Sequence, residues 1–251
     1  MQRYRATLSY DGADFAGFQR QGQGARTVQG ELEGALGRIG WSGHSITGAG
    51  RTDRGVHALG QVVAFELEWG HSEGDLLKAL NANLPADMAI LELGAADPDF
   101  HPRFSARSRR YRYTIYNSPI RQPLRERYAW RVWPEMSLPP LEASAAALPG
   151  EHDFGSFGTS PESGGHTIRR VLSAGWRHSP VEGQAGDWWI FEIEAEAFLY
   201  RMVRTLVGAM KQVATGELTP DDFRGILAAR RRETSAPPAP ACGLCLVEAK
   251  Y

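Results

Sequence analysis

The stretch Gly48-Ala49-Gly50-Arg51-Thr52-Asp53-Arg54-Gly55-Val56-His57-Ala58 places one carboxylate between two arginines in a glycine-rich loop. Apolar residues that alternate over 63–69 follow this loop and predict a strand. A carboxylate held near a cation stays ionised and is able to act as a nucleophile. The letters Thr-Asp-x-Gly also form a common turn in which the aspartate binds its own backbone. Asp53 is therefore a candidate catalytic residue that has a structural alternative.

Apolar periodicity on both sides of this loop predicts strands that alternate with helices. We expect strands at residues 4–10, 63–69, 88–93, 105–117, 128–132, 169–177, 188–194 and 244–249. We expect helices at 28–39, 73–84, 138–148 and 198–213, and one that begins after Thr219. The rhythm predicts an α+β protein made of two similar β/α halves, with a mostly antiparallel central sheet and helices on its outer face. The expected subdomains are 1–104 and 105–251.

Composition limits the function less than the distribution of charge does. The 251 residues carry a formal net charge of -1, so total charge does not indicate a nucleic-acid partner. Between His101 and Arg131, however, there are nine arginines and one acid, Glu126. The planar guanidinium suits bidentate contact with phosphate, so this cluster favours an anionic partner over a merely solvated strand face.

The sequence gives no pattern for a metal site or a membrane span. Cys242 and Cys245 form a lone C-x-x-C without a second Cys or His pair at zinc spacing, in a segment that reads as a strand. We expect both thiols to be reduced and buried, which fits a cytoplasmic protein. No apolar run approaches the roughly 18 residues of a membrane span, and the N-terminus has no secretory apolar region.

Ordered motifs along almost the whole chain resemble those of TruA-type tRNA pseudouridine synthases. The family signature Gly-Arg-Thr-Asp-x-Gly-Val-His is present at residues 50–57. Further matching motifs are Tyr10-Asp11-Gly12, Asn83-Leu84-Pro85, Arg103-Phe104-Ser105, Tyr111-x-Tyr113, Asp153-Phe154-x-Ser156-Phe157 and Phe198-Leu199-Tyr200-x-Met202-Val203-Arg204. The chain departs from the family at Arg54, where many members have alanine, and in extra residues between Pro237 and Gly243.

The resemblance implies a fold and an activity. The fold would be that of the pseudouridine synthases, with halves like RNA-recognition or ferredoxin-like domains. The subdomain 1–104 would carry the catalytic aspartate loop, and 105–251 the base-stacking tyrosine and the arginine helix. The activity would be the isomerisation of uridine to pseudouridine at positions 38, 39 and 40 of the tRNA anticodon stem-loop. The family works without a cofactor or metal, and as a homodimer that holds tRNA.

The same resemblance assigns four residues. Asp53 would be the nucleophile and Arg204 the arginine that pairs with it. Arg51 would help to flip the uridine out of its stack, because unstacking a base costs a few kcal/mol. Tyr111 would stack on the uracil. Periodicity alone places Arg204 on the polar side of its helix and so indicates a solvated side chain. For Tyr111 the alternative is packing on Tyr113 in the sheet.

Two other classes of function stay open at this point. A non-catalytic RNA-binding module would use Tyr111, Tyr113 and the arginines for stacking and phosphate contact alone. A hydrolase would use Asp11 and Asp53 as paired carboxylates, with or without a metal. The first predicts that Asp53→Asn leaves the function intact, and the second predicts water as the acceptor or dependence on a metal.

Overall fold

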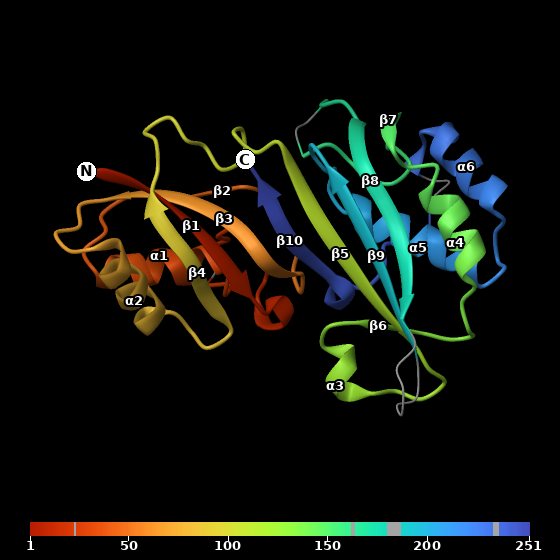
Figure 1. Cartoon of the computed structure of the whole chain (residues 1–251), viewed down its shortest axis with the longest axis horizontal. Coiled ribbons are helices and arrows are strands. Elements are labelled where there is room, and N and C mark those ends of the chain that lie inside the picture. The colour runs from red at the N-terminus through yellow and green to blue at the C-terminus, as the bar shows by residue number, and fades with distance from the viewer. Residues whose placement is uncertain (23, 162–163, 180–186, 233–235) are drawn as a thin grey trace. The chain divides into compact units, whose positions relative to one another are not determined.

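The computed structural model describes residues 1–22, 24–161, 164–179, 187–232 and 236–251. They form two compact units, of which unit 1 comprises Met1–Arg107 and Cys245–Tyr251 and unit 2 comprises Ser108–Leu244. In each unit, helices pack on a sheet whose neighbouring strands are mostly antiparallel (Figure 1). This confirms the predicted α+β class.

Unit 1 follows the order βαββαβ. Its elements are β1 (Gln2–Tyr10), the 3-10 turn η1 (Gly12–Asp14), α1 (Val28–Arg38), β2 (Thr47–Gly48), β3 (His57–Leu67), α2 (Glu73–Asn83) and β4 (Met88–Ala95). Strand β1 lies between β4 and β3 and is antiparallel to both, and β2 is antiparallel to β3. Alternate residues of β1 (Tyr4, Ala6, Leu8 and Tyr10) are buried, as a strand with one covered face requires.

Local sequence signals fix where the helices of unit 1 begin and end. The side chain of Thr27 accepts a hydrogen bond from the backbone N–H of Gly30, and Ser72 accepts one from Asp75. These caps satisfy amide groups that the first turn of a helix leaves unpaired. Gly40 follows α1 with a φ of 94°, in the left-handed region, and α2 ends before Pro85. The expected boundaries of both helices are confirmed to within a residue or so.

Unit 2 repeats the alternation with more insertions. Its elements are β5 (Ser108–Asn117), α3 (Pro123–Glu126), β6 (Trp130–Val132), α4 (Leu138–Ala145), β7 (Gly150–Asp153), β8 (Ile168–Ser179), β9 (Asp187–Ala195), α5 (Met202–Ala214), α6 (Pro220–Ala229) and the 3-10 turn η3 (Ala241–Gly243). The sheet runs β5-β9-β8-β7 with antiparallel neighbours, and β6 is parallel to β5. Its buried face carries Trp176, Phe191 and Ile193.

The structure corrects three local expectations, in unit 2 and at Cys245 of unit 1. Helix α5 begins at Met202 instead of residue 198, because Arg201 adopts a left-handed conformation with a φ of 61° just before it. Cys242 lies in η3 and not in a strand, and both cysteines are half-buried where burial was expected. The short elements β7 and α3 have four residues each, which is too few to give a periodic signal.

Strand β10 (Leu244–Lys250) connects the end of the chain to unit 1. It runs parallel to β3, with Cys245 opposite His57 and Leu246 opposite Ala58. Residues 245–251 therefore belong to the same compact unit as residues 1–107. The subdomain boundary expected from the sequence assigned them to the second subdomain, 105–251. The sequence pattern identified β10 as a strand but contained no information about its partner.

We expect Gly60→Ala to destabilise unit 1 at the contact between β3 and β10. A Cβ at this position would overlap the backbone carbonyl oxygen of Val247. Such overpacking costs about 1–3 kcal/mol, which equilibrium urea unfolding would measure. The control is Gly94→Ala in β4, where the nearest atom to a Cβ is a carboxylate oxygen of Glu73 at 3.7 Å. Equal stabilities of the two variants would contradict this packing.

Candidate active site

Asp53 lies half-buried in the loop between β2 and β3 of unit 1. Its carbonyl oxygen accepts a hydrogen bond of 3.1 Å from the N–H of Val56. Gly55, with a φ of 79°, occupies the turn position that favours glycine. The turn that the letters Thr-Asp-x-Gly suggested is thus present. Arg51 and Arg54 on either side of Asp53 are exposed.

Residues 10–18 hold the backbone on both sides of Asp53. The Tyr10 hydroxyl lies 2.8 Å from Oγ1 of buried Thr52. The Thr52 carbonyl accepts a hydrogen bond of 3.0 Å from the Phe18 N–H, and the Gly55 N–H donates to the Phe15 carbonyl at 3.4 Å. The aspartate is therefore flanked by fixed points, which is what a reacting group needs to keep its orientation.

A third connection joins this segment to the start of β3. The N–H of Gly12 donates a hydrogen bond of 3.0 Å to Nδ1 of buried His57. Oδ1 of Asp11 lies 3.1 Å from the same nitrogen. A Cβ on Gly12 would overlap the carbonyl oxygen of Val56, so the two backbones are in direct contact. The Tyr10-Asp11-Gly12 motif was the available signal for this contact, but from the sequence Asp11 was considered only as a paired carboxylate of a hydrolase.

Arg26 supports the same segment from the other side. Its guanidinium donates two hydrogen bonds, of 2.7 and 2.8 Å, to the carboxylate of Asp87 and lies 4.3 Å from the centre of the Phe15 ring. The backbone carbonyl of Asp87 accepts a bond of 2.9 Å from the Asp11 N–H. The hydrogen bonds from Arg26 lower the pKa of Asp87.

In unit 2, Arg204 is half-buried on α5 and is held by the segment that precedes β10. Its Nε donates a hydrogen bond of 2.7 Å to the carbonyl of Ala239, whose N–H donates back to the Arg204 carbonyl at 2.9 Å. A Cβ on Gly208, one helical turn further on, would overlap the carbonyl of Pro237. Periodicity predicted that the Arg204 side chain is solvated. This prediction is wrong, because a segment distant in sequence covers that side of the helix.

The neighbouring strand β5 presents Tyr111 and Tyr113 on the face toward α5. Tyr111 is half-buried and lies opposite Ile193, with its ring edge-on to Phe198 at 4.9 Å between centroids. Tyr113 is fully buried and donates from its hydroxyl to the Pro240 carbonyl at 2.7 Å. Burial raises the pKa of Tyr113 well above its usual value. The two tyrosines therefore differ in access, and Tyr111 is the one with exposed surface.

The candidate residues are divided between the units. Asp53 and Arg51 belong to unit 1, and Tyr111 and Arg204 belong to unit 2. Each side chain has a defined setting within its own unit. The expected pairing of Arg204 with Asp53 joins the two units and stays a prediction.

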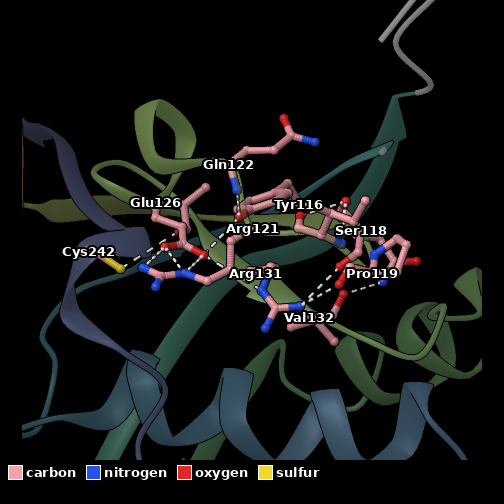
Figure 2. Close-up of polar contacts among 12 residues, drawn as sticks. Tyr116, Ser118, Pro119, Arg121, Gln122, Glu126, Arg131, Val132 and Cys242 are labelled. Atoms are coloured by element: carbon pink, nitrogen blue, oxygen red, sulfur yellow. Dashed lines mark hydrogen bonds and ion pairs between the residues drawn. The ribbon is translucent and has the colours of Figure 1, made fainter. Parts of the chain in front are cut away.

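Several arginines of the basic cluster have partners within unit 2 (Figure 2). Glu126 accepts hydrogen bonds from Arg121 at 2.6 Å and from the Tyr116 hydroxyl at 3.1 Å, and Arg131 lies 3.6 Å from it. Arg131 also donates to the Ser118 carbonyl at 3.3 Å. Glu126 is thus the centre of an ion-pair network that orders the connection between β5 and β6. Part of the cluster therefore stabilises the unit, which its charge count could not reveal.

The described part of the chain contains neither a candidate metal cluster nor a helix that could span a membrane. In that part of the chain, no three or more His, Cys, Asp or Glu side chains are grouped so that they could hold a metal ion. None of the helices there combines the length and apolar character needed to cross a bilayer.

The family model and the related proteins that match this chain have the same description, tRNA pseudouridine synthase. Residues 6–105 and 144–251 match a family model described as tRNA pseudouridine synthase, a match that leaves out the segment containing Tyr111. The tRNA pseudouridine synthase A of Moorella thermoacetica is 41% identical over 250 residues, which cover 98% of each chain. The protein of the same name from Solidesulfovibrio magneticus is 41% identical over 262 residues, covering 100% of this chain and 92% of its own.

We expect Asp87→Asn to remove a stabilisation that depends on pH. Since the pKa of Asp87 is lowered from 3.8 in the folded protein, its ion pair stabilises above that value and the contribution is lost as pH falls through the folded pKa. With 36% of the Arg26 side chain exposed, the loss at pH 7 should be about 1 kcal/mol. Urea unfolding at pH 7 and pH 3 would measure it.

The wild type and Asp87→Asn should approach each other in stability at the lower pH. Glu66→Gln serves as the matched control. Glu66 pairs with Arg3 and its side chain is 54% exposed, so loss of this ion pair should change the free energy of unfolding by less than about 0.5 kcal/mol. A difference between wild type and Asp87→Asn that stays constant with pH would rule out this origin.

Proposed function

This chain belongs to the family of tRNA pseudouridine synthases, isomerases that act on tRNA, and we propose that it converts uridine to pseudouridine at positions 38, 39 and 40 of the anticodon stem-loop. The observation that carries the proposal is the setting of Asp53. It is half-buried in a turn, between backbone positions bound to residues 10–18, within the region of the family match. A nucleophile in such a setting meets its substrate in one orientation.

The proposed chemistry is an isomerisation with no net change in composition. The bond between N1 of uracil and C1′ of the ribose breaks, the base turns, and a bond from C5 to C1′ replaces it. The C5 proton then leaves, and N1 ends with a proton. The carboxylate of Asp53 forms a transient bond either to C1′ or to the ring, and its departure restores the enzyme. Because the product has the same atoms and oxidation level as the substrate, the reaction needs no external oxidant, reductant or group donor. As the family resemblance implies, we propose that it uses no cofactor or metal.

The other three residues have proposed roles that come from the family resemblance, and their settings are compatible with these roles. Arg51, exposed beside Asp53, takes the place of the flipped base in the stem and offsets part of the unstacking cost. Tyr111 stacks on the uracil and accepts the C5 proton. Arg204 pairs with the carboxylate of Asp53 and keeps it ionised. Its bond to Ala239 supports this role by fixing the direction of the guanidinium.

We place the tRNA backbone along arginines of the segment between Arg103 and Arg131. Arg103, Arg107 and Arg127 are exposed, whereas Arg121 and Arg131 are engaged with Glu126. Contacts of this kind bind phosphate and shape without reading base edges. As the family resemblance implies, we further propose a cytoplasmic homodimer. In it, residues 1–104 supply the catalytic loop and residues 105–251 supply Tyr111 and Arg204.

Asp53→Asn should abolish isomerisation and leave tRNA binding nearly unchanged. The substitution keeps the size of the side chain but removes the negative charge and the nucleophilic oxygen. We expect a loss of at least about 10⁴-fold in kcat, a magnitude typical when an essential catalytic group is removed. The measurement is release of tritium from C5 of labelled uridine in unmodified tRNA, with filter binding for affinity.

The alternatives predict other results in the same assay. A variant that keeps wild-type turnover would show that Asp53 is not the nucleophile, and a wild type that binds tRNA without isomerising it would favour a binding module. We expect EDTA to leave the rate unchanged. Loss of activity on chelation, or cleavage that transfers the base to water, would favour the hydrolase with paired carboxylates.

Arg204→Lys should lower kcat by about 10²-fold and change KM much less. An arginine can donate from Nε to the Ala239 carbonyl and from its terminal nitrogens to a carboxylate at the same time. The single ammonium group of a lysine cannot make both sets of hydrogen bonds in this geometry. The matched control is Arg224→Lys. Arg224 is exposed on α6 and pairs with Asp221, so this variant should retain full activity. Equal activity of Arg204→Lys and wild type would contradict the pairing of Arg204 with Asp53.

A further inference from the structure

We propose that His57 is the positioning residue of the Asp53 loop, and that it acts as a neutral imidazole through Nδ1. The inference rests on the proposed role of Asp53 and goes beyond it, by naming the group that sets the geometry of the nucleophile. His57 lies four residues after Asp53, at the first position of β3, and is 7% exposed. It is therefore placed to act through the backbone and not on the substrate.

The hydrogen bond from Gly12 requires that Nδ1 of this histidine carries no proton. A backbone N–H can only donate, so Nδ1, at 3.0 Å, accepts with its lone pair. The proton of the neutral ring is then on Nε2. If Nδ1 carried a proton, two N–H groups would face each other and the bond would be lost.

The bond to Gly12 is coupled to Asp53 through backbone contacts. Gly12 lies against the carbonyl of Val56 so closely that no Cβ would fit, and the N–H of Val56 binds the carbonyl of Asp53. A shift of Gly12 therefore moves Val56, and Val56 moves the turn that carries the carboxylate. The pair Tyr10 and Thr52 fixes the other side of the turn. Asp53 is held between a hydroxyl pair before it and the imidazole after it.

Protonation would offer Nδ1 a different partner. Oδ1 of Asp11 lies 3.1 Å from Nδ1 and accepts from the Ala13 N–H in the present arrangement. A protonated ring would donate to this carboxylate instead of accepting from Gly12. The charged groups described around it are Asp11 and, next along the segment, Asp87 with its partner Arg26. Protonation should therefore exchange one anchor for another and release Gly12.

Asparagine and glutamine separate the role of Nδ1 from simple packing. The Oδ1 of asparagine has the same position relative to the main chain as Nδ1, so His57→Asn keeps an acceptor for Gly12. Glutamine fills the space better, but its polar atoms lie nearer the position of Nε2. If only volume matters, His57→Gln should be the better substitute. If the acceptor matters, His57→Asn should be better although it leaves a larger cavity.

The test compares wild type, His57→Asn, His57→Gln and Asp53→Asn on unmodified tRNA. We expect His57→Gln to lose about 10²-fold in kcat, the effect of a displacement of about 1 Å, with little change in KM. His57→Asn should recover at least about tenfold of that loss.

Hydrogen exchange of the peptide that covers residues 52–57 gives a readout that does not depend on activity. Exchange should accelerate in His57→Gln and stay close to wild type in His57→Asn. Equal exchange and equal kcat in the two variants would overturn the positioning role. If exchange follows the acceptor while Asp53→Asn keeps its activity, then His57 does position the loop and the proposed nucleophile is wrong.

Discussion

The close approach of two backbones, at Gly12 and Val56, is the constraint on which the candidate site depends. The lack of a side chain at Gly12 lets the segment after β1 lie directly against the loop that carries Asp53. Hydrogen bonds at Thr52, Gly55 and His57 then fix that loop from both ends. Buried polar groups of this kind are costly when left without partners, so the network also specifies one arrangement of the loop.

Unit 2 uses the same principle for a different side chain. Arg204 would be a solvated residue if α5 stood alone, because it lies on the polar side of the helix. The segment from Pro237 to Pro240 covers that side, binds the guanidinium through Ala239 and binds the hydroxyl of Tyr113 through Pro240. The family resemblance predicts extra residues between Pro237 and Gly243, and the contacts of this segment give it a place against the helix.

Much of the fold could be predicted from the sequence, because local signals define its helices and longer strands. Thr27, Ser72 and Thr219 cap helices as expected, and the alternation in β1 shows its buried face. The four-residue elements β7 and α3 carry too little pattern to be found. The family match confirms the recognition that the motifs suggested. Which residues hold the loop on either side of Asp53 could not be predicted, since those contacts join segments that lie roughly forty residues apart.

The amino-acid sequence was enough to identify the family, the α+β class, the order of the longer elements and the candidate residues, although β3 begins at His57 and not at the expected residue 63. These properties depend on local letter patterns, which a chain carries whether or not it is folded. Only the tertiary structure decided that β10 pairs with β3, that Arg204 is covered and not solvated, and that His57 accepts a hydrogen bond from Gly12. Each of these depends on a contact between distant segments, and such contacts are set by packing of the whole unit and not by local preference.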